Sequence, residues 1–176
     1  MDSKESVRHG YENLGIEGYY KIHSEDYNNP HFLYIKRLVT EYTNKNDIGH
    51  NILDMCCGSG EITTILNEVG EYNVEGLDPY TESAYVKNTG KECMKYSFKD
   101  IVCGALKNKR YDTVICSFAM HLCEESMLNM LLFQISLVTD RLIIITPHKR
   151  PEITNWFKLN CEMKYNKVKL RVYYKI

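Results

Sequence analysis

The chain has 176 residues, of which 44% are hydrophobic and 26% are charged, and its formal net charge is −1. This composition is typical of a soluble globular protein, and the near-neutral charge excludes a general electrostatic attraction to nucleic acid or membranes. No apolar run reaches about 18 residues, so we expect neither a signal peptide nor a membrane-spanning helix, and no membrane partner.

Seven cysteines are spread along the chain, and most of them lie in apolar, strand-like runs. Their number is odd, and the adjacent Cys56 and Cys57 do not form a C-x-x-C motif. No second pair completes a zinc site, so no metal is expected. Free cysteines usually behave as small buried hydrophobic residues. These features favour a reducing compartment, and the expected location is the cytoplasm.

The first 30 residues are polar, rich in tyrosine and without a strand pattern. A helix is predicted over 31–42, where apolar residues recur at helical spacing and Pro30 suits the first turn. No repeat and no Pro-rich linker divides the chain. We therefore predict one domain over residues 1–176.

Strands and helices then alternate to the end of the chain. Strands are predicted over 51–57, 73–78, 93–98, 111–117 and 141–146. Helices are predicted over 61–69, 81–88 and 124–138, with one or two helical turns over 152–157. Two final strands, 160–165 and 167–175, form a predicted hairpin. The alternation predicts a doubly wound α/β fold with a mostly parallel sheet, helices on both faces and a C-terminal antiparallel hairpin.

The segment 52–61, ILDMCCGSGE, places Asp54 in the first strand and Gly58 and Gly60 in the turn that follows. Glycines there let the backbone approach a ligand closely. A dinucleotide-binding fingerprint needs a third glycine, where this chain has Thr63. An acidic strand residue also suits a ligand with an ammonium group better than a pyrophosphate. A plain tight turn is the alternative interpretation.

Two further aspartates follow predicted strands. Asp78, before Pro79, lies 24 residues after Asp54, close to the spacing of about 20 that nucleoside-binding βαβ units use for a ribose ligand. Asp100 could accept a hydrogen bond from an adenine amino group while Ile101 packs on the ring. Both aspartates could instead be ordinary helix caps. Residues 117–121 form the loop after the fourth strand, where sheets of this type open their ligand crevice.

In this order, the four motifs resemble the class I S-adenosylmethionine-dependent methyltransferases, over residues 51–176. The resemblance implies a seven-stranded sheet of order 3-2-1-4-5-7-6, a Rossmann-like core over 31–176, and S-adenosyl-L-methionine as cofactor, with S-adenosyl-L-homocysteine as product. Asp54, Gly58 and Gly60 would hold the methionine end, Asp78 the ribose and Asp100 the adenine. Cys56 replaces the family's usual first glycine. The expected cofactor-binding residues are Tyr20, Asp54, Cys56, Gly58, Gly60, Asp78, Pro79, Asp100, Ile101 and Ser117.

The methyl acceptor is less well defined by the sequence. His121, on the loop after the fourth strand, is the candidate catalytic base, although it could simply cap the next helix. The resemblance implies that residues 1–30 form a tyrosine-rich lid. A basic loop after the fifth strand suggests an anionic acceptor. The expected substrate-binding residues are Tyr19, His23, Tyr27, His148, Lys149 and Arg150.

These features predict a methyltransferase that acts on an O or N nucleophile of an anionic small molecule. Two alternatives stay open: an RNA or protein methyltransferase, with or without a partner subunit, and a non-catalytic protein that binds the cofactor. The sequence does not indicate the oligomeric state.

Overall fold

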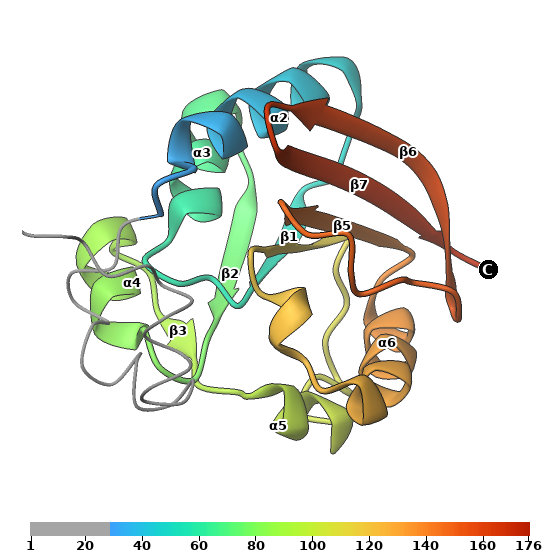
Figure 1. Ribbon diagram of the computed structural model, residues 1–176. Coiled ribbons are helices and arrows are strands. Elements are labelled where there is room, and N and C mark those ends of the chain that lie inside the picture. Colours follow the sequence, from blue (N-terminus) through green and yellow to red (C-terminus); the bar gives the residue numbers. More distant parts are fainter. Residues whose placement is uncertain (1–28) are drawn as a thin grey trace, which may run out of the picture.

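A seven-stranded sheet of order β3-β2-β1-β4-β5-β7-β6 lies at the centre of the computed structural model, which describes residues 29–176 (Figure 1). The strands are β1 (Asn51–Met55), β2 (Asn73–Leu77), β3 (Cys93–Met94), β4 (Thr113–Ser117), β5 (Arg141–Thr146), β6 (Phe157–Tyr165) and β7 (Val168–Lys175). The first five strands run parallel, and β7 pairs antiparallel with β5 and β6. The predicted fold class and strand order are confirmed. The predicted lid over 1–30, with Tyr19, Tyr20, His23 and Tyr27, lies almost entirely outside the described residues.

Helices cover both faces of the sheet because side chains alternate along each strand. The helices are α2 (Phe32–Lys45), α3 (Glu61–Val69), α4 (Glu82–Thr89), α5 (Phe98–Val102) and α6 (Glu125–Val138), with a short 3-10 helix, η1 (Met120–Leu122). In β4, Val114 and Cys116 join the hydrophobic core under α6, whereas Ile115 joins the core under α2 and α3. Figure 1 shows α2 and α3 on one side of the sheet and α5 and α6 on the other.

Two local predictions differ from the structure. The helical turns predicted over 152–157 were wrong: the segment is irregular, and β6 begins at Phe157. Trp156 there has a left-handed φ of 68°, and its indole N–H donates to Asn129 on α6, so a tertiary contact sets the conformation of this segment. The strand predicted over 93–98 is limited to Cys93–Met94. It ends early because Ser97 caps α5 in a capping box with Asp100.

Candidate functional site

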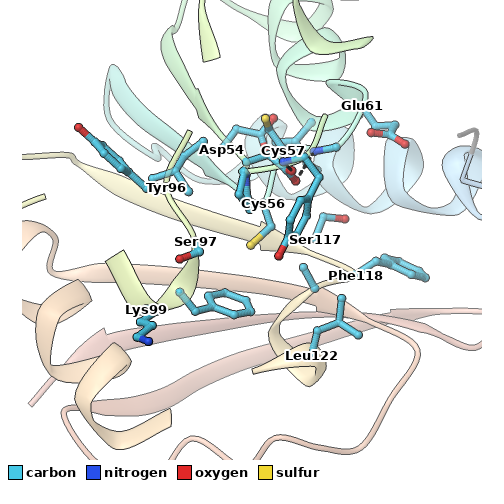
Figure 2. Close-up of a pocket in the computed structure, with 18 of the residues that line it drawn as sticks. Asp54, Cys56, Cys57, Glu61, Tyr96, Ser97, Lys99, Ser117, Phe118 and Leu122 are labelled. Atoms are coloured by element: carbon cyan, nitrogen blue, oxygen red, sulfur yellow. Dashed lines mark hydrogen bonds between the residues drawn. The ribbon is translucent and has the colours of Figure 1, made fainter. Parts of the chain in front are cut away.

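The carboxyl ends of β1, β2 and β4 open into a cavity of about 390 Å³ (Figure 2). In doubly wound sheets, ligands bind at this edge, where the strand order reverses. Here the reversal lies between β1 and β4, because the chain passes from β3 at one edge back to the middle of the sheet. The cavity is within the size range of small-ligand sites.

The turn from β1 to α3 forms the floor of the cavity. Cys56, Gly58 and Gly60 all have positive φ values, of 59°, 55° and 93°. The Cys57 N–H donates to the Leu77 carbonyl at 3.0 Å, which ties the turn to the end of β2. A Cβ on Gly60 would lie 2.5 Å from the Thr89 methyl carbon, so only glycine fits there. Cys56 takes its left-handed conformation with a full side chain, which costs strain that glycine would avoid.

Asp54 is only 1% exposed and borders the cavity from β1. Its Oδ2 atom accepts hydrogen bonds from the Thr63 hydroxyl at 2.8 Å and from the Thr63 N–H at 3.2 Å. Thr63 also contacts the buried Tyr85 hydroxyl at 3.0 Å. Burial raises the pKa of Asp54 to about 7, and the hydrogen bonds from Thr63 oppose that shift only in part. The network joins Asp54 firmly to α3.

Asp78 follows β2 and lies beside Pro79 in the cavity wall. Its Oδ1 atom accepts from the N–H groups of Tyr80 at 2.8 Å and Thr81 at 3.2 Å. Its Oδ2 atom accepts a long hydrogen bond, 3.3 Å, from the Gly58 N–H. Burial raises the pKa of Asp78, and the hydrogen bonds that stabilise its charged form oppose that shift in part. The backbone thus orients this carboxylate toward the cavity with acceptor capacity left on Oδ2.

The end of the cavity next to β3 has a different lining from the one expected. Tyr96, Ser97, Phe98 and Lys99 line it, whereas Asp100 and Ile101 do not. The Asp100 Oδ2 atom accepts from the Ser97 N–H and hydroxyl at 2.8 and 2.7 Å, and these bonds lower the pKa of Asp100. Ile101 is fully buried in the core. The expected adenine contacts are therefore not brought to the cavity, because both side chains serve the packing and capping of α5.

The end of β4 contributes Ser117 and Phe118 to the cavity. Phe118 has a φ of 56°, which is unusual for a bulky side chain, and its ring stacks on His31 with 5.3 Å between centroids. Asn29 also lines the cavity, and its Oδ1 atom accepts from the His31 N–H at 2.9 Å. The segment just before α2 therefore helps to build the wall next to β4.

The expected catalytic and basic residues are not part of the cavity lining. His121 belongs to η1, and its ring lies 4.2 Å from that of His148 between centroids. Burial, and to a lesser degree His148, lowers the pKa of His121 to about 4. Lys149 and Arg150 are exposed on the loop after β5. The backbone carbonyls of His148 and Lys149 in this loop accept hydrogen bonds from the Arg171 guanidinium. The contact between the two histidines joins this loop to the loop that carries Phe118.

Glu61 is a cavity residue to which the sequence analysis gave no role. It is the first residue of α3 and lines the cavity. Burial raises the pKa of Glu61, and hydrogen bonds from its own backbone, Ser59 and Asn29 oppose that shift in part. The signal that could have identified it is an acid directly after a G-x-G turn. With Asp54, Asp78 and Glu124, Glu61 gives the cavity lining four carboxyl groups. No group of three or more metal-ligating side chains occurs within residues 29–176, and no helix of that part has the length and hydropathy of a membrane span.

Comparison with known proteins identifies relatives of the whole arrangement. Residues 52–140 match a family model described as a methyltransferase domain. An uncharacterized protein of Schizosaccharomyces pombe, C17A5.05c, is 28% identical over 191 aligned residues, which cover 84% of this chain and 77% of the relative.

Solved structures share the fold at low sequence identity. Magnesium protoporphyrin IX methyltransferase of Synechocystis PCC 6803, with bound SAM, has a TM-score of 0.62 at 16% identity, over 100% of this chain and 98% of the other. The PH0226 protein of Pyrococcus horikoshii OT3 has a TM-score of 0.67 at 17% identity, over 92% of this chain and 100% of the other. With the family match over half of the chain, the strand order and the cavity at the carboxyl ends of β1, β2 and β4, the chain belongs to the methyltransferase domain family, as a class I S-adenosylmethionine-dependent methyltransferase.

Proposed function

We propose that the cavity holds the cofactor with its amino-acid end over the β1–α3 turn, its ribose at Asp78 and its adenine between β3 and α5. We further propose that the enzyme methylates an O or N nucleophile of a small anionic molecule. The observation that carries the proposal is the set of four carboxyl groups, Asp54, Glu61, Asp78 and Glu124, in a single cavity at the carboxyl ends of the strands.

The residues present fit a cationic nucleoside. A buried carboxylate without a basic partner is costly, and a positively charged ligand offsets that cost. The Asp78 carboxylate can accept from ribose hydroxyls, and Phe98 offers an apolar surface for a base. The side chain of Ser97 also faces the cavity at that end (Figure 2). A pyrophosphate, by contrast, would meet a cavity wall rich in carboxyl groups.

The bound cofactor supplies a methyl group on a positively charged sulfur. The chain's own part in the reaction is to align the acceptor within about 3–3.5 Å and to keep water out. Phe118, Ala119 and Leu122 give the β4 side of the cavity an apolar wall that serves the second task. The left-handed backbone of Phe118 directs its ring toward the His31 side of that wall.

The groups near the β4 end favour an acceptor that is already ionised. His121 is uncharged at neutral pH, but a pKa of about 4 makes it a weak base, since general bases work best with a pKa near the operating pH. A carboxylate or similar oxyanion needs no base. Such an anionic acceptor also suits the positive charges of Lys149 and Arg150. Their loop contacts the loop after β4, because the His148 ring packs against the His121 ring. We retain His121 as the candidate base for acceptors that must lose a proton.

Calorimetry tests the cofactor part of the proposal. S-adenosylhomocysteine should bind the wild-type chain, and a nicotinamide dinucleotide should not. Asp78→Asn removes a charge-assisted acceptor, so the affinity for S-adenosylhomocysteine should fall about tenfold to a hundredfold. Preferential binding of the dinucleotide would overturn the assignment.

A methylation assay with labelled cofactor tests the acceptor part. Pools of small carboxylates and phosphates should be labelled, and RNA and protein fractions should not. With the acceptor identified, Lys149→Ala plus Arg150→Ala should raise its KM several-fold and leave S-adenosylhomocysteine affinity unchanged. The effect should weaken as salt screens exposed charges. The matched control is Lys107→Ala plus Arg110→Ala. These two basic residues precede β4, on the side of the sheet where the strands begin. Labelling confined to RNA or protein would identify a macromolecular acceptor instead.

A further inference from the structure

Two thiols lie in contact at the floor of the cavity. Cys57 belongs to the turn between β1 and α3 and lines the cavity (Figure 2), whereas Cys93 is the first residue of β3. Their sulfur atoms are 3.6 Å apart, although 36 residues separate them in the sequence. Both cysteines are free, and with the buried Tyr85 they form a small hydrophobic cluster of their own. The fold thus makes a thiol pair from cysteines of two different strand ends.

Both cysteines are also attached to the end of β2, just where Asp78 follows. The Cys57 N–H donates to the Leu77 carbonyl at 3.0 Å. Cys93 pairs with Gly76 in the parallel ladder of β2 and β3, and its thiol donates to the Asp78 carbonyl at 3.7 Å. A covalent bond between the two sulfur atoms would therefore link the turn after β1 to β3, next to the backbone of Asp78.

The two thiols differ in acidity. Burial, and then the contact with Cys93, raise the pKa of Cys57, whereas the hydrogen bond from Cys57 lowers the pKa of Cys93. The thiolate is the form of cysteine that reacts with oxidants, and redox-sensing cysteines combine a lowered pKa with a second cysteine nearby. Cys93 therefore suits the role of the sulfur that is oxidised first, and Cys57 that of the sulfur that reacts with it.

We propose that Cys57 and Cys93 form a site of reversible oxidation, in which a disulfide between them weakens cofactor binding. The oxidant is a peroxide. The Cys93 thiolate attacks one oxygen of hydrogen peroxide, which gives a sulfenic acid and hydroxide, and the hydroxide takes up the proton that Cys93 had released. The Cys57 sulfur then attacks the Cys93 sulfur, and the sulfenic hydroxyl leaves as water with the Cys57 proton. Two thiols are oxidised to one disulfide, and the peroxide is reduced to two water molecules.

The disulfide would displace the floor of the cavity. Bonded sulfur atoms are about 2.05 Å apart, so the two sulfur atoms must approach each other by about 1.5 Å. Cys57 directly precedes Gly58, whose N–H donates to the Asp78 carboxylate, so the turn moves relative to that carboxylate. The effect on the cofactor rests on the proposed function, which places the cofactor over this turn and at Asp78. A bound cofactor would in turn cover Cys57 and oppose its oxidation.

Peptide mass spectrometry and calorimetry test the two parts of the proposal separately. After treatment with hydrogen peroxide, the full chain should yield a peptide in which Cys57 is linked to Cys93, and dithiothreitol should remove the link. The oxidised chain should bind S-adenosylhomocysteine at least about tenfold more weakly than the reduced chain, as expected for the loss of one hydrogen bond. Reduction should restore the affinity. Saturating S-adenosylhomocysteine should slow formation of the link.

Cys93→Ser removes the first sulfur from outside the cavity lining, so this variant should bind S-adenosylhomocysteine like the reduced wild type and keep that affinity after peroxide treatment. Cys103→Ser is the matched control, because Cys103 is an exposed cysteine that ends α5, and this variant should respond to peroxide as the wild type does. If Cys93→Ser does not fold, Cys57→Ser is the second variant, and it should form no link to Cys93.

Three results would overturn the proposal. The first is a peroxide-treated wild type without a link between Cys57 and Cys93, including one in which Cys56 is linked to Cys116 instead. The second is a linked chain that binds S-adenosylhomocysteine as tightly as the reduced chain. The third is an equal loss of affinity in peroxide-treated Cys93→Ser. A reduced wild-type chain that does not bind S-adenosylhomocysteine would instead overturn the proposed function, whatever the mapped disulfide.

Discussion

At the scale of single residues, Cys56 shows how the ligand site departs from an ideal turn. Its φ of 59° lies in the left-handed region, which side chains with a Cβ adopt at a cost of about 1–2 kcal/mol. The nearby thiol of Cys116, together with burial, raises the pKa of Cys56. Strain of this kind is concentrated at functional sites, where the surrounding structure maintains it.

Cys56→Gly and Cys56→Ala separate the strain from the thiol contact. Both variants lose the contact with Cys116, but only glycine relieves the backbone. We expect Cys56→Gly to have an unfolding free energy about 1 kcal/mol higher than Cys56→Ala, measured by urea denaturation. Equal stabilities would mean that the strain at residue 56 does not exceed the extra entropy that glycine gives the unfolded chain.

Asp54 couples stability to pH. Its pKa rises from an ordinary 3.8 to about 7 in the folded chain, so the folded state holds a proton that the unfolded state releases. The unfolding free energy from this group therefore falls as pH rises from about 4 to about 7, by at most on the order of 4 kcal/mol. Glu61 and Asp78, whose pKa values are also raised, add slopes of the same sign.

Asp54→Asn should remove the largest part of this slope. Urea denaturation at about pH 5 and about pH 8 should show that the wild type loses more stability between the two values than the variant does. The difference should appear mainly as greater stability of the variant at the higher pH, where wild-type Asp54 must carry a buried charge. A wild type and variant with identical pH dependence would show that Asp54 keeps an ordinary pKa.

At the scale of elements, the contact between β2 and α4 supports the site indirectly. Gly76 of β2 faces the ring of Tyr85 on α4, and a Cβ on Gly76 would lie 2.3 Å from the Tyr85 Cζ atom. Tyr85 is fully buried and reaches Thr63 on α3, which in turn holds Asp54 on β1. The absence of a side chain at residue 76 thus lets three elements meet at one hydrogen-bond network.

Gly76→Ala should destabilise the fold by about 1–3 kcal/mol, the usual cost of overpacking a core. Its backbone φ is not in the left-handed region, so the cost comes from the clash alone. In a Tyr85→Ala background the same substitution should cost little, because the ring is gone. A thermal or urea double-mutant cycle measures this coupling. A large cost of Gly76→Ala that persists without Tyr85 would contradict the clash.

The short helix α5 allows a test of the two interpretations of Asp100. In the structure its carboxylate completes the capping box with Ser97. Asp100→Ala should therefore lower Tm by a few degrees, as expected for a lost helix cap in a chain of this size, and leave S-adenosylhomocysteine affinity unchanged. A large loss of affinity with unchanged Tm would favour the adenine role predicted from the sequence.

At the scale of the whole molecule, the cavity is built on β1, β2 and β4, which are consecutive strands in the middle of the sheet (Figure 1). A ligand that binds only the folded state raises stability by about 2.7 kcal/mol at a hundred times its Kd. S-adenosylhomocysteine at that concentration should raise Tm by roughly 5–10 °C, and a nicotinamide dinucleotide should not. A thermal shift assay measures both. A shift with the dinucleotide alone would contradict the proposed cofactor site.

The sequence alone determined the fold class and the turns after β1, β2 and β4 that border the cavity, and the family resemblance implied the strand order. Hydrophobic periodicity is a local property, and so are the G-x-G turn after Asp54 and the acid at the end of β2. A resemblance carried by such local motifs sufficed to predict the antiparallel β7 as well. All of these features depend on residues that are close together in the sequence, so they can be recognised without knowledge of the fold.

Only the tertiary structure decided how the individual side chains are used. Asp54, Glu61 and Asp100 are all acids near predicted ligand positions, but they differ in their partners. Thr63 donates to Asp54 and Ser97 donates to Asp100, whereas the Oε1 atom of Glu61 has no hydrogen-bond partner within residues 29–176. The contact of His121 with His148 and that of Trp156 with Asn129 likewise join segments distant in sequence. Whether a polar group is free for a ligand depends on which donors reach it in three dimensions, and residue type and spacing do not contain that information.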